Sequence, residues 1–61
     1  MQTSDLIHGK QYNYTVIDQP PRLVRFRHET LNYWMFDVED ENRFILLHKQ
    51  QVLSNITEIQ L

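Results

Sequence analysis

The sequence predicts a small all-β protein whose five antiparallel strands follow one another as a meander closed into a barrel. Residues typical of turns recur about every ten positions, at Gly9-Lys10, Pro20-Pro21, Thr30 to Asn32, Asp40 to Asn42 and Gln50-Gln51. The segments between them are short and rich in aromatic and β-branched side chains. The 61 residues make one domain, 1–61, with an N-terminal turn over 1–9, the barrel over 10–57 and a tail over 58–61.

The first two strands are separated by a pair of prolines. Ser4 to Gly9 predicts a turn, with Gly9 at a positive φ. A strand follows from about Tyr12, with apolar and polar side chains in alternation. Pro20-Pro21 ends it, because proline donates no backbone hydrogen bond.

The strands over 22–28 and 33–39 have the clearest alternation. A three-residue loop over 30–32, with Asn32 left-handed, places Val24, Phe26 and His28 opposite Val38, Phe36 and Trp34 in one register. The same register places Arg25 opposite Asp37 and Arg27 opposite Met35 on the outer side.

The next hairpin predicts a fourth strand through Ile45 and Leu47. A two-residue loop at Glu41-Asn42 sets Val38 opposite Ile45, with a slightly longer loop as the alternative. For the tail, a short 3-10 turn over 49–51 and a last strand over 52–57 compete with a C-terminal helix over 50–59. The expected core side chains are Val16, Val24, Phe26, Trp34, Phe36, Val38, Ile45, Leu47, Val52 and Ile56.

A domain this small has a limited core, and the chain has no cysteine for a disulfide. A homodimer or a protein partner would add buried surface. The absence of cysteine, of a long apolar run and of a signal-peptide pattern predicts a cytoplasmic protein without a membrane segment.

Charge divides unevenly along the chain. The net charge is −2; residues 1–28 carry four basic and two acidic side chains, whereas residues 29–61 carry two basic and six acidic ones. In a meander these halves become neighbouring strands, so the pattern favours cross-strand ion pairs over two binding poles.

The order of motifs resembles a known family. Asp5-Leu6-Ile7-His8-Gly9-Lys10-Gln11-Tyr12 is followed by Val24-Arg25-Phe26, Tyr33-Trp34-Met35-Phe36, an acidic turn, Phe44-Ile45-Leu46-Leu47 and Val52 to Ile56. This succession resembles the small SH3-like β-barrel proteins of bacteria and their phages. Residues 45–52 are also similar to the last hairpin of Sm-like and Hfq-like RNA-binding barrels, although the glycine of the bent second strand and the Asn-Gly turn of those families are not present. The resemblance implies an SH3-like barrel fold and assigns no functional residue.

No pattern predicts catalysis, a cofactor or a metal site. His8, His28 and His48 lack the close spacing of zinc ligands. The acidic residues 39–41 fall at a hairpin tip, where water solvates carboxylates, and the two serines form no triad pattern. We therefore expect a protein that is not an enzyme.

The outer side of the predicted sheet is the candidate binding surface. It gathers arginine, aromatic and aliphatic side chains, the composition of interface hot spots: Arg25, Arg27, Tyr33, Met35, Phe44 and Leu46. This composition predicts a protein-interaction module, a small regulator or inhibitor that docks by this face or by strand addition at an open edge.

Three other interpretations remain. In the first, the first strand or the tail of the chain covers this face within the barrel, so that no binding surface is exposed. Alternatively, the protein binds single-stranded RNA or DNA weakly, with bases stacked on Tyr12, Tyr14 or Tyr33 and phosphates on Arg22, Arg25 and Arg27. A purely structural role, in a phage particle or a toxin system, is the third.

Overall fold

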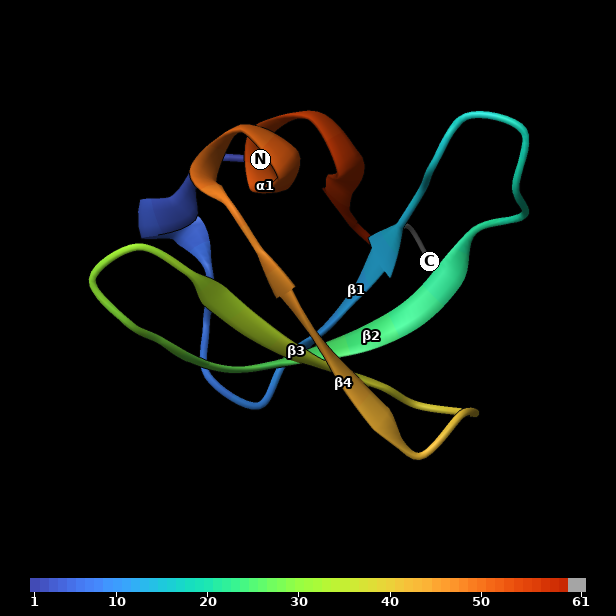
Figure 1. Ribbon diagram of the computed structural model, residues 1–61, viewed down its shortest axis with the longest axis horizontal. Coiled ribbons are helices and arrows are strands. Elements are labelled where there is room, and N and C mark those ends of the chain that lie inside the picture. Colours follow the sequence, from blue (N-terminus) through green and yellow to red (C-terminus); the bar gives the residue numbers. More distant parts are fainter. Residues whose placement is uncertain (60–61) are drawn as a thin grey trace.

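The computed structural model describes residues 1–59. Its elements run in the order η1 (Thr3–Asp5), β1 (Gln11–Tyr14), β2 (Arg22–Glu29), β3 (Trp34–Val38), β4 (Arg43–Leu47), α1 (Lys49–Asn55) and β5 (Ile56–Glu58) (Figure 1). The five strands form one antiparallel sheet in the order β4-β3-β2-β1-β5. The expected tail 58–61 thus begins inside β5, and residues 60–61 lie outside the described residues.

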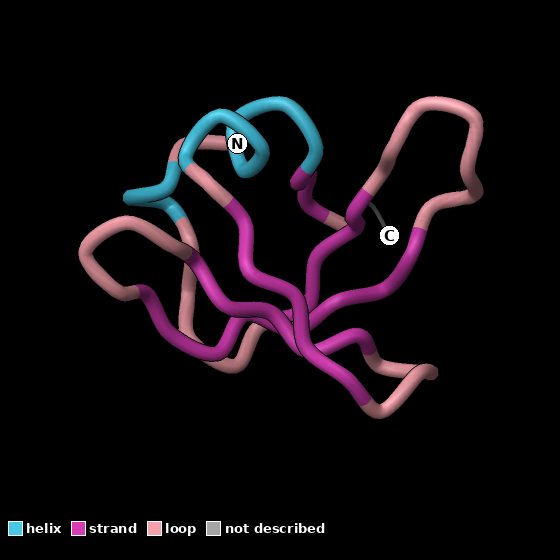
Figure 2. Tube along the Cα trace, viewed as in Figure 1, coloured by secondary structure: helices cyan, strands magenta, loops and turns pink. Residues whose placement is uncertain are grey.

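The sheet is open, so the prediction of a closed barrel is not confirmed. β1 pairs with both β2 and β5, which brings the first and last strands together. A closed meander also requires β4 to pair with β5, whereas these two strands are the edges of the sheet. In place of that pairing, α1 connects β4 to β5 (Figure 2).

The β2–β3 hairpin confirms half of the expected register. Val24, Arg25 and Phe26 pair with Val38, Asp37 and Phe36 as predicted. Beyond Phe26 the register shifts, so that His28 pairs with Met35 and Glu29 with Trp34. The cause is an extra residue in β2, a β-bulge that leaves Arg27 without a partner in β3.

The bulge also makes the loop over 30–33 longer than expected. The Thr30 N–H donates to the Tyr33 carbonyl (2.8 Å), and the Tyr33 N–H donates to Thr30 Oγ1 (3.1 Å). Asn32 is not left-handed; the non-glycine residues with positive φ among the described residues are Asp18 and Asn42. The prediction for Asn32 was therefore wrong.

The β3–β4 hairpin has the longer loop, over residues 39–42. Val38 pairs with Arg43 and Phe36 with Ile45, a displacement of two residues from the two-residue-loop register. Asn42 takes the left-handed conformation, with a φ of 52°. Because side chains alternate with a period of two, this displacement leaves every side chain on its expected face.

The C-terminal region combines the two predicted forms. Residues 49–55 are helical and only 56–58 are extended, so a strand beginning at Val52 and a helix reaching Ile59 were both wrong. The His48 N–H donates to Gln51 Oε1 (2.8 Å) at the start of α1, and the Ile56 N–H donates to the Val52 carbonyl at its end. The Met1 ammonium donates to the Leu53 carbonyl (2.9 Å), which ties the first residues to α1.

The core lies between the sheet and the two short helices. The fully buried side chains are Tyr12, Val24, Phe26, Phe36, Val38, Leu47, Val52 and Ile56. Trp34 and Ile45 are half-buried against this core, whereas Val16 lies beyond β1 and outside the buried cluster. Tyr12 was not among the expected core residues; its hydroxyl accepts a hydrogen bond from the Ile7 N–H (2.9 Å). Among residues 1–59, no helix is long and apolar enough to cross a membrane.

Candidate functional site

Strands β2, β3 and β4 bring the predicted binding residues onto one side of the sheet, which we call the outer face. The core residues Val24, Phe36 and Val38 point to the opposite side, so the residues that alternate with them point outward. Arg25, Asp37 and Phe44 form one row across the three strands, and Met35 and Leu46 form the next. Arg27 lies at the bulge and Tyr33 directly before β3. All six predicted residues, Arg25, Arg27, Tyr33, Met35, Phe44 and Leu46, therefore belong to this region.

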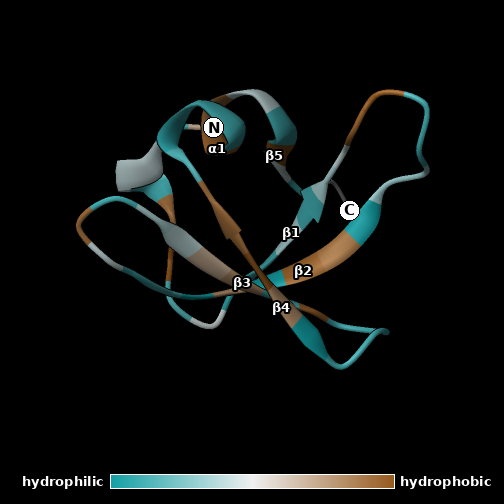
Figure 3. Ribbon diagram, viewed as in Figure 1, coloured by the Kyte–Doolittle hydropathy of each residue, from teal (hydrophilic) through white to brown (hydrophobic). Residues whose placement is uncertain are grey.

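The apolar side chains of the outer face are exposed. Phe44 is 57% exposed, Leu46 47% and Tyr33 39%, and Met35 is half-buried. Hydrophobic residues run along β4 at the edge of the sheet (Figure 3). Within residues 1–59, neither β1 nor the C-terminal segment covers these side chains, since β1 lies on the far side of β2 and α1 packs into the core.

The two arginines of the outer face differ in their contacts. Arg25 Nε lies 2.8 Å from Glu39 Oε1, and its Nη1 donates to the Gly9 carbonyl (2.6 Å). Arg25 thus fastens the N-terminal turn and the β3–β4 loop to β2. Arg27 makes one ion pair, with Asp37 Oδ2 at 3.2 Å, and its side chain is 57% exposed. Arg27 is consequently the more accessible of the two.

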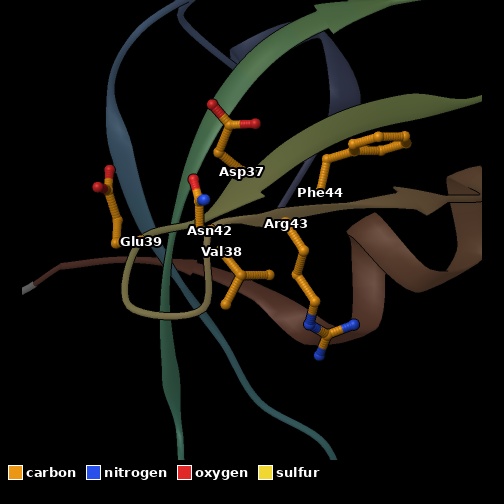
Figure 4. Close-up of a pocket in the computed structure, with 6 residues that line it drawn as sticks. All are labelled: Asp37, Val38, Glu39, Asn42, Arg43 and Phe44. Atoms are coloured by element: carbon orange, nitrogen blue, oxygen red, sulfur yellow. The ribbon is translucent and has the colours of Figure 1, made fainter.

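A shallow depression of about 260 Å³ adjoins the outer face at the β3–β4 hairpin, lined by Asp37, Val38, Glu39, Asn42, Arg43 and Phe44. In Figure 4 the Asp37 carboxylate and the Phe44 ring lie on one side of the hairpin, and the Arg43 side chain points to the other. Asp37 pairs with Arg27 of β2, and Glu39 pairs with Arg25 of β2. The depression therefore continues the outer face at the β3–β4 hairpin, with two carboxylates that are held by ion pairs.

Other ion pairs join basic side chains of the first half of the chain to acidic ones of the second half, as the division of charge predicts. Glu41 accepts hydrogen bonds from Arg22 and from Arg43, the latter at 2.7 Å. These bonds, first that of Arg22 and then that of Arg43, lower the pKa of Glu41. His8 Nε2 lies 3.1 Å from Glu29 Oε2, and this hydrogen bond is the main cause of the lowered pKa of Glu29.

The three tyrosines proposed to stack on bases are not equivalent. Tyr12 is fully buried and Tyr14 is partly buried against the core. Tyr33 is 39% exposed, and its ring lies against that of His48 at a tilt of 43°, with 4.9 Å between ring centroids. Of the three tyrosines named for base stacking in the nucleic-acid alternative, Tyr12 therefore offers no exposed ring.

Sequence reasoning missed His48 and Asp37 as members of this surface. His48 follows β4 directly and meets Tyr33, which precedes β3, so the sheet pairing joins them. Asp37 holds Arg27 in place on the outer face. The alternation of residues 33–39 already placed Asp37 outward, but its partner depended on the bulge at Arg27.

Comparisons of the chain with protein-family models, with curated proteins and with solved structures gave no match.

Proposed function

We propose that this chain is a small protein-interaction module that regulates or inhibits a larger cytoplasmic protein by docking on it through the outer face. The observation that carries the proposal is the continuous exposed apolar surface of Tyr33, Phe44 and Leu46, with Met35 between them. The absence of cysteine from the sequence is consistent with a reducing compartment. We also propose that the sheet is an open variant of the SH3-like barrel, because β1 pairs with the last strand.

The composition of this surface suits protein recognition. Tyrosine and arginine are over-represented among residues that dominate binding energy, especially where neighbouring contacts exclude water. Tyr33 lies at one end of the apolar surface, Arg27 lies on its β2 side in contact with Asp37, and Phe44 and Leu46 extend it along β4. A partner that covered this surface would bury both the apolar side chains and the Arg27–Asp37 ion pair.

The test is affinity capture from the cells that make the protein, with quantitative mass spectrometry. The face variant carries Arg27→Ala and Tyr33→Ala. The control variant carries Ile17→Ala and Gln19→Ala, two exposed side chains of the loop between β1 and β2, which contains no outer-face residue. Circular dichroism is used to check that both variants are folded.

We expect a captured protein whose recovery falls with the face variant and not with the control. Once that protein is purified, its affinity for the face variant should be at least ~30-fold lower, the effect of losing one hot-spot residue. Equal affinity for the two variants would show that the partner docks elsewhere.

The nucleic-acid alternative has less support. Arg22, Arg25 and Arg27 each pair with a carboxylate, and Tyr12 is buried. Binding to phosphates would require breaking those ion pairs. Tight binding of a single-stranded oligonucleotide that weakens steeply with added salt would favour this alternative over protein docking.

A further inference from the structure

Beyond its first residue, Arg43, the β4 edge of the sheet lacks the features that usually protect an edge strand. Residues 44–47 contain no charge, proline or bulge. The opposite edge, β5, has only three residues, and its Glu58 pairs with Lys10 (3.7 Å). Folded proteins protect exposed edges with short strands, charges, proline or bulges. The β4 edge is therefore the one open to another strand.

The backbone groups available at this edge follow from the hydrogen bonds of the β2–β3 ladder. The Glu39 N–H donates to the Leu23 carbonyl (3.1 Å), so Leu23 and Glu39 form a hydrogen-bonded pair. Every second pair along an antiparallel ladder is bonded. Arg25 and Asp37 therefore form a hydrogen-bonded pair too. The β3 residues that alternate with Asp37 and Glu39, which are Phe36 and Val38, direct their N–H and C=O groups to β4.

The same alternation shows in which direction the backbone N–H and C=O groups of each β4 residue point. Val38 directs its N–H and C=O to Arg43, and Phe36 directs its own to Ile45. Phe44 and Leu46 therefore point their backbone groups away from the sheet. Within residues 1–59, none of the hydrogen bonds made by turns, loops or side chains uses these groups.

We propose that the β4 edge pairs with the β4 edge of a second copy of this chain, antiparallel, about a two-fold axis at Ile45. In this register Phe44 of each copy faces Leu46 of the other. Because both residues point their groups outward, each such pair exchanges two N–H···O=C bonds. The sheets of the two copies become one continuous sheet, and the interface is the same patch on both.

The side chains fit this register as well as the backbone does. On the outer face the ring of Phe44 lies beside Leu46 of the second copy, an aromatic–aliphatic cross-strand pair, twice over. The half-buried Ile45 meets its own counterpart at the axis. The exposed apolar surfaces of the two copies therefore join, and water is removed from side chains that are about half exposed in the single chain.

Hydrogen-bond direction and strand length disfavour the neighbouring registers. A shift by one residue would set outward-pointing backbone groups against inward-pointing ones. A shift by two in either direction leaves only three residues of β4 paired with the second copy, because β4 ends at Arg43 and at Leu47. In the proposed register all five residues of β4 are paired, and Arg43 faces Leu47 of the second copy.

Backbone N-methylation of the 61-residue chain, made by chemical synthesis, tests the pairing while keeping every side chain. N-methylation of Leu46 removes a donor that points away from β3. The matched control is N-methylation of Glu58 on the β5 edge. Thr15 donates to the Asn55 carbonyl (2.9 Å), so by alternation Thr57 faces β1 and Glu58 faces away from it.

Sedimentation equilibrium over a concentration series should give twice the 7.5 kDa chain mass for the unmodified chain and for the Glu58 control. The Leu46 variant should dimerise at least ~10-fold more weakly, since each dimer loses two of its hydrogen bonds. A chain that is monomeric throughout, or a Leu46 variant that dimerises as well as the control, would overturn the proposal. Equal weakening by both variants would also overturn it, because β4 would then meet β5 of the next copy.

A measurement on the unmodified chain guards against misfolding of the variants. A mixture of isotope-labelled and unlabelled chains should show an intermolecular nuclear Overhauser effect between the Phe44 ring and the Leu46 methyl groups. Its absence from a confirmed dimer would assign the contact to another surface. Since N-methylation keeps the outer-face side chains, these results are independent of the docking partner proposed above.

Discussion

Replacing Tyr12 by phenylalanine removes one oxygen atom from the best-buried part of β1. The Tyr12 side chain is fully buried, and its hydroxyl accepts the Ile7 N–H at 2.9 Å. Lys10 Nζ lies 5.7 Å from the ring centroid, and phenylalanine keeps this contact. The substitution therefore isolates the hydrogen bond that joins the N-terminal turn to the core.

The expected cost is about 0.5–1.5 kcal/mol, the net contribution of one such hydrogen bond. Ile7 is 57% exposed, so water can reach the freed N–H and the cost stays within that range. For a domain of this size, it corresponds to a fall of about 2–12 °C in Tm. Phe36→Ala, in contrast, removes a fully buried ring at about 3–5 kcal/mol. A chain this short has only about 3–9 kcal/mol of stability, so Phe36→Ala should unfold much of the population.

Thermal unfolding followed by circular dichroism, with urea unfolding at 25 °C, measures both variants. An unchanged Tm for Tyr12→Phe would refute the assignment of the hydrogen bond between the Tyr12 hydroxyl and the Ile7 N–H, because a hydroxyl that bonds only to water has no internal bond to lose. A loss of unfolding free energy as large as that of Phe36→Ala would also refute this assignment, since the hydroxyl would then contribute far more than one hydrogen bond to the N-terminal turn.

Two further predictions concern the ion pairs. Hydrogen bonds from Arg22 and Arg43 lower the pKa of Glu41 below its ordinary value of 4.5 in the folded chain, so the stability they contribute is present above pH 4.5 and is lost as the pH falls. Glu41→Gln should thus lower Tm at neutral pH and flatten its decline in acid, whereas an acid decline identical to that of the unmodified chain would contradict this linkage. Arg25→Met should destabilise the chain more than Arg27→Met, because Arg25 also bonds a backbone carbonyl, while a single exposed pair contributes about 0.2–1 kcal/mol. Urea unfolding compares the two variants, and equal losses would contradict the structural role of Arg25.

The sequence placed most core and outer-face residues correctly where the alternation was regular. In residues 23–26 and 34–38, the inward positions are all apolar, Arg25 and Asp37 fall at outward positions, and the buried residues of β2 and β3 are those expected. All six candidate binding residues also came together, since each was assigned from the same alternation. Their function remains a proposal, because exposure and composition do not identify a partner.

The errors arose where the outcome depended on contacts between distant residues. The bulge at Arg27 could not be inferred from the local sequence. It occurs together with the Arg27–Asp37 ion pair and the four-residue loop over 30–33, which join residues that are distant in the sequence. Tyr12 was not among the expected core residues, because the bond between its hydroxyl and the Ile7 N–H forms only in the folded chain. The boundary between the helix over 49–55 and the strand over 56–58 could not be located, because the local sequence of this segment is compatible with both helix and strand.

Outside the bulge, the sequence alone determined which side of the sheet a strand residue occupies, because the period-two alternation is a local property of the chain. Beyond the bulge, His28 pairs with the outward-pointing Met35 and not with Trp34. Only the tertiary structure decided the registers, the open edge at β4 and the helix that separates β4 from β5. A displacement of two residues leaves every side chain on the same face, so hydrophobic burial hardly distinguishes the competing registers. Loop geometry, the bulge and hydrogen bonds between strands distinguish them, and these form only when the whole sheet is assembled.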